Sequence, residues 1–297
     1  MSQLSIVVTC TDRKASPPAE RLRVRNLPQG DVAERVAEWG RRLDTAADPR
    51  PLTELYKGDH WVRSLRLPAS AAQAGFTAEL WVASAGLGLQ PVSASAPAYA
   101  ATFTSRHEDS VGGTFDERGT WWHHLQEERG ASRLTDLACK GPILLVLSEV
   151  YAAAIETELQ ALAAIGGEAL LIGGARDLPG LTRLPADGSL RSALGGTLTS
   201  LNVRMAAWWL EHCSGARLTQ PDTSAAWNDW VAQASKKERY HRAPMTDERV
   251  ISFIRESVAQ NPVHSRTRLL RMLRDQGLAC EQKRFADLYA ATVGKNQ

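Results

Sequence analysis

The sequence predicts an α/β fold, in which helices flank a largely parallel sheet, followed by a small C-terminal all-α domain. The first indication is the β-branched run SIVVTC at residues 5–10, which suits a buried strand. The second is PILLVLS at residues 142–148, a continuous apolar run typical of a sheet that is covered on both faces. The third is the alternation of such runs with amphipathic segments, which favours a parallel sheet built from βαβ units.

The helix and strand assignments follow from the same periodicities. In residues 31–43 (DVAERVAEWGRRL), Val32, Val36 and Trp39 share one helical face, and Asp31 is the expected N-cap. The remaining expected elements of this domain are strands at 79–85 and 168–174, helices at 120–128, 149–165 and 197–213, and a polar loop at 106–115.

The composition is that of an ordinary globular protein. The chain has 297 residues, of which 43% are hydrophobic and 23% charged, enough for one large domain and a small one. Its 4 cysteines lie far apart without a CxxC pair, which argues against a disulfide framework or a zinc site. We find no signal peptide and no apolar run near the ~20 residues of a membrane helix. We therefore expect a soluble cytoplasmic protein with no metal, cofactor or membrane partner.

Charge is distributed unevenly along the chain. From residue 236 onward there are 13 Lys and Arg and 7 Asp and Glu, a net charge of +6, whereas the preceding residues carry −4. A basic tail on a mildly acidic body indicates a polyanionic partner. The composition also changes after residue 215. We therefore divide the chain into an α/β domain with a pocket (1–215), a connector (216–245) and a helical DNA-binding module (246–297).

The C-terminal module contains three short helical patterns, at residues 247–260, 265–276 and 280–292, and Gly277 is placed to end the second helix. Three such helices with basic outer faces resemble a helix-turn-helix or winged-helix module. The alternative is a solvated helix face that happens to be rich in arginine. The candidate DNA-binding residues are Lys236, Lys237, Arg266, Arg268, Arg271, Lys283 and Arg284.

The α/β domain is organised around residues 55–103. A strand there runs into Gly86, at a point where backbone is expected to approach another group closely. The turn from Lys57 to Asp59 places opposite charges nearby, and Tyr99 can form a wall. These features predict a binding pocket at the C-terminal edge of the sheet.

Four motifs occur in order along this domain: YKGD (56–59), SAGLGL (84–89), PAYAATF (97–103) and LSEVY (147–151). This order resembles the YaaA peroxide-stress family and its shorter uncharacterised relatives, over roughly residues 5–211. The chain departs from the family where Gly86-Leu87-Gly88 replaces the usual tyrosine-glycine. The resemblance implies DNA binding and a role in protecting or policing DNA. More distantly, the α/β core is similar to uracil-DNA-glycosylase-type folds.

Base excision requires a carboxylate that orients water or stabilises an oxocarbenium-like sugar, a pocket for the flipped base, and cationic contacts to phosphate. The similarity to that fold class implies Asp12, directly after the first strand, as the water-activating carboxylate. Asp59 and Glu149 are further candidates at the expected pocket edges. A turn-capping role for Asp12 and a helix-dipole role for Glu149 are the structural alternatives.

The substrate-binding candidates fall into three groups. Cations would contact phosphate, small residues at strand ends would form the pocket, and two aromatic rings would stack on a base, although such rings are more often core or wall residues. These groups are Arg13, Lys14 and Lys57, then Ser84, Gly86 and Ser148, then Tyr99 and Tyr151. The adjacent His123 and His124 do not share a helical face, so we favour a packing role for them over metal binding.

Several enzyme classes are disfavoured because their motifs are absent: HExxH, the P-loop GxxxxGK[ST], a GxGxxG after the first strand, and GxSxG. The first hypothesis is a DNA glycosylase-like hydrolase that excises a base, in particular a modified one, in phage defence or DNA protection. The second is a non-enzymatic DNA-binding stress or defence protein. The third is a nucleoside-processing enzyme without a duplex partner.

Overall fold

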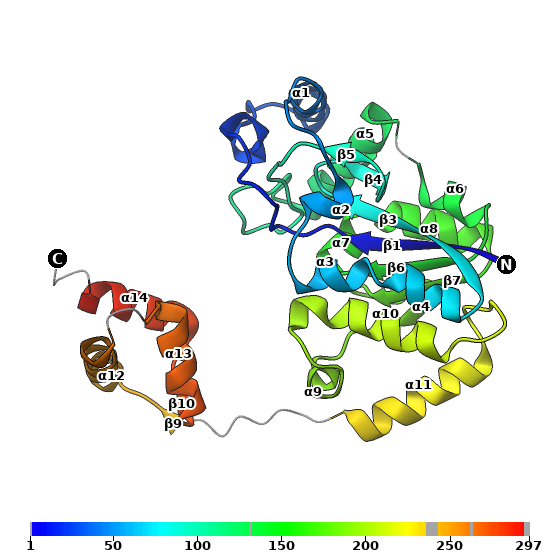
Figure 1. The fold of residues 1–297 in the computed structure, drawn as a ribbon. Coiled ribbons are helices and arrows are strands. Elements are labelled where there is room, and N and C mark those ends of the chain that lie inside the picture. Colours follow the sequence, from blue (N-terminus) through cyan, green and yellow to red (C-terminus); the bar gives the residue numbers. More distant parts are fainter. Residues whose placement is uncertain (1, 131, 236–242, 262–263, 294–297) are drawn as a thin grey trace. The chain divides into compact units, whose positions relative to one another are not determined.

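The computed structural model describes residues 2–130, 132–235, 243–261 and 264–293 (Figure 1). The chain divides into two compact units, with the division between residues 236 and 237. Each unit has its own apolar core, and each is described separately.

The first unit is built on a six-stranded sheet with the strand order β4-β3-β1-β6-β7-β8. All neighbouring strands are parallel except β4, which runs antiparallel to β3. The α/β fold with a largely parallel sheet, predicted from the sequence, is therefore confirmed. The strands are β1 (Ser2–Thr9), β3 (Phe76–Ser84), β4 (Gly88–Pro91), β6 (Ile143–Leu147), β7 (Ala169–Gly173) and β8 (Thr182–Leu184).

Helices cover both faces of this sheet (Figure 1). One face carries α3 (Asp59–Ser64), α4 (Leu67–Gln73) and α10 (Leu201–His212). The other carries α5 (Phe115–Glu128), α6 (Leu134–Ala138), α7 (Glu149–Ala154) and α8 (Glu156–Ile165), and α1 (Val32–Asp44) packs on α5. The smaller elements of the unit are α2 (Leu52–Leu55), α9 (Arg191–Leu194) and the two-residue antiparallel pair β2 (Arg50–Pro51) and β5 (Ser95–Ala96).

Local capping chemistry explains where the helices begin. The Asp31 carboxylate accepts a hydrogen bond from the Glu34 N–H at 2.8 Å, as the sequence predicts for α1. Helix α5 begins at Phe115, earlier than the predicted residue 120, because Thr114 and Glu117 form a capping box. That box lies inside the polar stretch that the sequence assigned to a loop.

The predicted single helix at 149–165 is two helices, α7 and α8, with a break at Ile155. The backbone of Ile155 leaves the helical region (φ −105°, ψ 20°), and its side chain is 1% exposed. Burial of this side chain in the core is compatible with a short break in helical hydrogen bonding, which periodicity alone does not reveal.

Helix α11 (Pro221–Ala234) lies in the stretch that the sequence assigned to a connector. Its Trp227 is 5% exposed, and the ring lies 5.0 Å from the Trp208 ring and 6.2 Å from the Trp209 ring, both on α10. This tryptophan contact makes α11 part of the α/β unit. The unit therefore extends past the predicted boundary at 215.

The second unit contains α12 (Asp247–Gln260), α13 (Arg266–Asp275) and α14 (Gln282–Val293), so the three expected helices are present. Thr246 and Ser265 cap the first two, each accepting a hydrogen bond from the N–H three residues further on. The helices enclose a small core of Met245, Val250, Ile254, Leu269, Leu270, Leu273, Cys280 and Phe285. A two-residue parallel pair, β9 (Ala243–Pro244) with β10 (Leu278–Ala279), is an element that the all-α prediction lacks.

The described part of the chain contains neither a membrane-spanning helix nor a metal-binding group of side chains. No helix there is both long and apolar enough to cross a bilayer. In the same residues, no group of three or more His, Cys, Asp or Glu side chains is arranged to hold a metal ion.

Candidate functional site

The topology of the sheet marks one edge as the place for a ligand. β3 pairs with one side of β1 and β6 with the other, so the connections from these strands diverge at the carboxyl ends of β1 and β6. In open α/β sheets, ligands bind outside the strands at such a switch point. Here the strands end at Thr9 and Leu147, and the next residues are Cys10 and Ser148.

Cys10 and Tyr151 connect the two sides of the switch point. The Cys10 Sγ lies 3.0 Å from the Tyr151 hydroxyl, which is carried by α7 directly after β6. The Tyr151 side chain is 7% exposed, its ring packs edge-on against Phe103 at 5.0 Å, and burial raises the pKa of its phenol. Tyr151 therefore forms a wall of the site. Its ring presents no exposed face on which a base could stack, although the sequence analysis suggested such stacking.

A short antiparallel bridge joins the turn after β1 to the YKGD motif. Lys14 pairs with Tyr56, and the Lys57 N–H donates to the Arg13 carbonyl at 2.9 Å. Because side chains alternate along extended backbone, Lys14 and Tyr56 share one side of this bridge and Arg13 and Lys57 share the other. Arg13 and Lys57 are both exposed. The sequence prediction of two cations at this edge is thus compatible with the geometry.

Beneath the bridge lies a buried hydroxyl network. The Tyr99 hydroxyl is 2.6 Å from the Tyr56 hydroxyl and 2.5 Å from Ser84 Oγ, which also accepts hydrogen bonds from the backbone N–H groups of Gly86 and Leu87. Burial raises the pKa of both phenols, so they are neutral hydrogen-bonding groups. The predicted site residues Ser84 and Tyr99 are therefore interior residues that fix the shape of the strand end.

Gly86 serves this network and not a ligand. A Cβ at Gly86 would lie 2.4 Å from Tyr99 Cε2, and the Gly86 carbonyl accepts a hydrogen bond from Trp39 Nε1 at 2.8 Å. The glycine is required because the Tyr99 ring lies against its Cα. The close approach that the sequence predicts at Gly86 is therefore present, but the approaching group is the Tyr99 ring. Tyr99 is fully buried, so it also presents no face to a base.

The Lys14 ammonium is held against this aromatic surface. Its Nζ donates to the Thr11 carbonyl at 2.8 Å and lies 4.5 Å from the centre of the Tyr99 ring and 5.6 Å from that of Tyr56. Burial lowers the pKa of Lys14, although the electrostatic influence of Cys10 and Asp12 opposes this effect. Lys14 remains partly exposed. Lys14 is thus a desolvated amine at the switch point, unlike a lysine that extends into water to bind phosphate.

The three candidate carboxylates have different surroundings. Asp12 is exposed in the turn directly after β1, and Glu149 is exposed in the first turn of α7. Asp59 begins α3 and receives two contacts from Arg204 Nη2, at 2.9 and 3.2 Å. A hydrogen bond from the Ser200 hydroxyl and the Arg204 guanidinium together lower the pKa of Asp59. Asp59 therefore joins α3 to α10, whereas Asp12 and Glu149 form no ion pair with any residue that the structure describes.

A histidine that the sequence analysis did not single out lies at the end of β1. His60 Nε2 is 3.0 Å from the Thr9 carbonyl and 3.4 Å from the Thr9 hydroxyl, and burial lowers the pKa of its ring. Its Nδ1 is buried without a hydrogen-bond partner among the described residues. His60 is in the YKGDHW stretch, but no spacing rule in the sequence connects it with β1.

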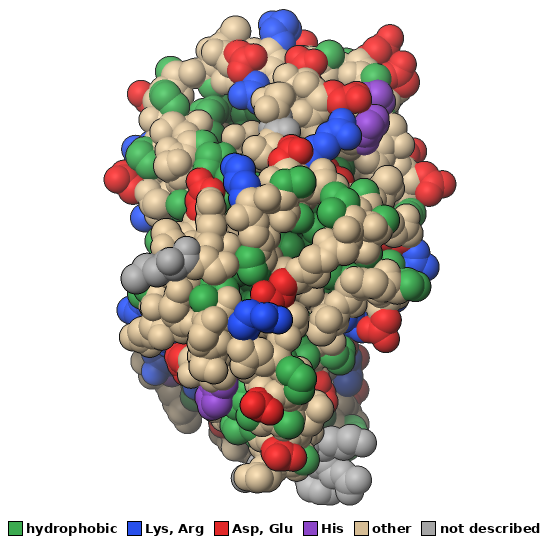
Figure 2. All heavy atoms as spheres, turned by 90° about the vertical axis from the view of Figure 1, so that its right-hand side faces the viewer, with side chains coloured by type: hydrophobic (Ala, Val, Ile, Leu, Met, Phe, Trp, Pro, Cys, Tyr) green, Lys and Arg blue, Asp and Glu red, His purple; other side chains and the backbone are tan. Residues whose placement is uncertain are grey.

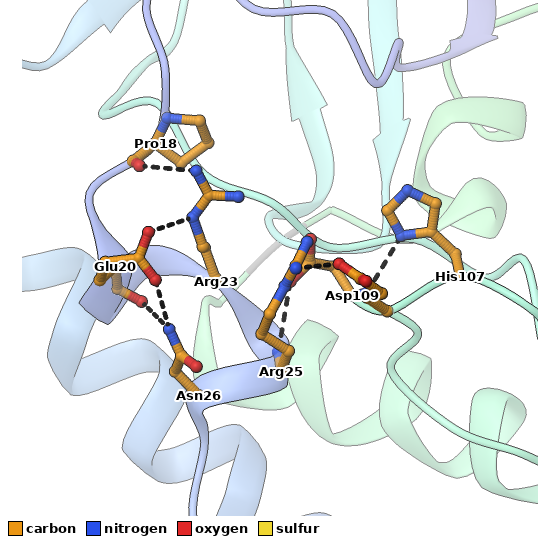
Figure 3. Close-up of polar contacts among 8 residues, drawn as sticks. Pro18, Glu20, Arg23, Arg25, Asn26, His107 and Asp109 are labelled. Carbon is orange, nitrogen blue, oxygen red and sulfur yellow. Dashed lines mark hydrogen bonds and ion pairs between the residues drawn. The ribbon is translucent and has the colours of Figure 1, made fainter. Parts of the chain in front are cut away.

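A second polar cluster ties the segment before α1 to the loop after the PAYAATF motif (Figure 3). Arg25 Nε and Nη2 donate to the two Asp109 oxygens at 2.8 and 2.5 Å, and Asp109 is 2% exposed. Burial would raise the pKa of Asp109, but the hydrogen bonds and charge of Arg25 outweigh it and lower the pKa. Figure 3 also shows His107 accepting from the Asp109 N–H and Glu20 paired with Arg23. The sequence offered no motif for these contacts.

The predicted DNA-binding residues of the second unit are divided by the structure. Arg266, Arg268 and Arg271 on α13 are exposed, as is Lys283 on α14. Arg284 is instead engaged inside the unit, since it pairs with Asp247 at 2.5 Å and donates to the Met245 carbonyl at 3.0 Å. Arg284 therefore has a structural role. The other two candidates, Lys236 and Lys237, lie outside the described residues.

The opposite edge of the α/β unit contains none of these candidates. Figure 2 views the molecule from the side where β1 begins, and acidic and basic side chains are intermingled there. A hollow of about 620 Å³ lies between α5, α6, α7 and α8, lined by residues that include Phe115, Trp122 and Glu158. No residue of the predicted site lines it. His123 borders this hollow and is exposed, so the packing role expected for it is wrong.

The structure therefore brings together five predicted residues and two further ones. These are Lys14, Ser84, Gly86, Tyr99 and Tyr151, with Cys10 and Tyr56 added. Comparisons with protein-family models, curated proteins and solved structures found no match. The function of the chain is therefore inferred from its own residues, and the resemblance to the YaaA family stays a prediction.

Proposed function

We propose that the chain is a DNA-binding protein whose second unit, of the helix-turn-helix type, contacts the phosphate backbone. The observation that supports this proposal most directly is the exposed arginine face of α13. Arg268 and Arg271 are three residues apart on the side opposite the buried Leu269 and Leu273, and Arg266 is exposed in the first turn. Guanidinium groups presented in this way bind phosphate, and each such contact makes binding weaker as salt rises.

The α/β unit supplies a second cationic position in this proposal. Arg13 and Lys57 lie side by side at the switch point on a unit that is otherwise net acidic. Two exposed cations at the carboxyl edge would hold a phosphate close to the turn that contains Asp12. Changing both to alanine should weaken DNA binding. The matched control is Lys140→Ala with Arg217→Ala, because those cations lie at the amino-terminal ends of β6 and β7.

A second candidate function is hydrolysis of an N-glycosidic bond in the bound DNA. It is favoured by Asp12, an exposed carboxylate at the switch point near the Lys14 ammonium. Asp12 would orient water toward the sugar of a flipped base, in particular a modified base, as phage defence or DNA protection would require. Binding without catalysis, and hydrolysis of free nucleosides, are the alternatives.

One experiment separates these functions. The full-length protein is incubated with unmodified and phage-modified duplexes, binding is measured by gel shift, and abasic sites are measured by alkaline cleavage. We expect alkali-labile sites with the wild-type protein and at least a hundredfold fewer with Asp12→Asn. If the DNA is shifted on the gel but never becomes alkali-labile, the result would support the non-enzymatic DNA-binding protein. Release of bases from free nucleosides without a gel shift would indicate the nucleoside-processing enzyme.

A further inference from the structure

The amine of Lys14 occupies a position that is unusual for a lysine. It is at the switch point, on the inner side of the Lys14–Tyr56 bridge, and the aromatic surface of Tyr56 and Tyr99 covers one side of it. Among the described residues, its Nζ donates a hydrogen bond to the Thr11 carbonyl. A lysine that only needed to bind phosphate would extend into solvent, as the neighbouring Lys57 does.

We propose that Lys14 is a Schiff-base-forming residue that reacts with the C1′ aldehyde of an abasic deoxyribose in DNA. This inference rests on the proposed DNA binding but does not require that the protein itself removes the base. It assigns to the site an abasic-site lyase activity, in which the strand is cut on the 3′ side of the lesion.

The steps balance without an added cofactor. The neutral Lys14 amine adds to the aldehyde carbon of the ring-opened sugar, and loss of one water with uptake of one proton from solvent gives the protonated imine. A base then removes a C2′ proton, and the electrons of that C–H bond expel the 3′ phosphate as the leaving group. Asp12 is the nearest exposed carboxylate in sequence and acts electrostatically on Lys14, so we assign it as the base. Water finally hydrolyses the imine and restores the amine.

The surroundings of the amine favour this chemistry over simple ion pairing. At pH 7 an ordinary lysine, with a pKa of about 10.4, is neutral in only about one molecule in 2,500. Burial against the two tyrosine rings lowers the pKa of Lys14 and so increases this reactive fraction. The electrostatic influence of Cys10, Asp12 and Asp109 acts in the other direction, and the neutral phenols of Tyr56 and Tyr99 add no charge.

The first test uses the full-length protein and 2-deoxyribose 5-phosphate with cyanoborohydride, which fixes an imine as a stable amine. Peptide mass spectrometry then reports the modified fraction of each lysine over time. We expect Lys14 to react at least tenfold faster than the exposed Lys57 and Lys140. A rate at Lys14 equal to or below theirs overturns the inference, whether or not the protein binds DNA.

The second test uses a duplex with one preformed abasic site and borohydride. We expect a covalent protein–DNA adduct at Lys14 and, without borohydride, strand cleavage, and both should fall at least tenfold in Lys14→Arg but not in Lys140→Arg, which changes an exposed lysine outside the site. Binding without an adduct, or an adduct only at other amines, refutes the lyase assignment. Absence of binding contradicts the proposed function instead, and the sugar-phosphate test then decides on Lys14. Because the adduct is mapped in the wild-type protein, a folding defect in Lys14→Arg does not obscure the result.

Discussion

Replacing two arginines of α13 provides the most direct test of the proposed DNA binding. The exposed predicted cations of the second unit are Arg266, Arg268, Arg271 and Lys283, and with Arg13 and Lys57 of the first unit they give six expected phosphate contacts. At a slope of about −0.9 per contact in a plot of log affinity against log salt, these six give about −5.4. Affinity should then fall about 1,800-fold between 50 and 200 mM salt.

The variant Arg268→Ala/Arg271→Ala removes two of these contacts. The slope should become about −3.6, and the affinity loss over the same salt range should shrink to about 150-fold. Both side chains are exposed, and the one ion pair involved, Arg271 with Asp275, is long at 3.9 Å. The melting temperature should therefore change little.

Fluorescence anisotropy of a labelled duplex, titrated at five salt concentrations, measures this slope. The control is Arg249→Ala/Arg255→Ala, which removes the same charge from exposed positions of α12. The control should keep the wild-type slope. An equal change of slope in both variants would refute the reasoning, because net charge and not the α13 face would then explain binding.

The remaining predictions concern the network that shapes the strand end. Gly86→Ala should lower the free energy of unfolding by about 1–3 kcal/mol, because its Cβ would meet Tyr99 at 2.4 Å. The control Gly119→Ala, with its nearest contact at 3.8 Å inside α5, should be neutral or stabilising, and equal effects in urea denaturation would count against the packing argument. Tyr99→Phe should cost about 1–3 kcal/mol in the same assay, since two buried hydroxyls lose a shared partner, and an unchanged midpoint would show that the network contributes nothing. Asp109→Asn should lower the melting temperature at pH 7. Because Arg25 lowers the folded-state pKa of Asp109, this stabilisation is present above the ordinary carboxylate value of about 3.9 and lost as the pH falls through the folded-state pKa. The gap between wild type and variant should therefore close in acid, and a gap that widens there would be inconsistent with the ion pair.

The sequence by itself determined the local structure. Apolar runs and helical periodicity located the main strands and the three C-terminal helices, and Asp31 was recognisable as a cap because capping depends on neighbours within one turn. The carboxyl edge of the sheet was recognisable as the place for a site, since parallel strands must all end there. Lys14, Ser84, Gly86, Tyr99 and Tyr151 lie near this edge, but their predicted role in substrate binding stays a prediction.

Only the tertiary structure decided what those residues do. Tyr99 follows the strand end by 15 residues, and nothing local shows that its ring fills the space beside Gly86 and not a ligand pocket. The contacts of Arg25 with Asp109 and of Asp59 with Arg204 join positions 84 and 145 residues apart. Such pairs depend on strand order and on how helices pack across the sheet, which are set by the burial of the whole core and not by any short stretch of sequence.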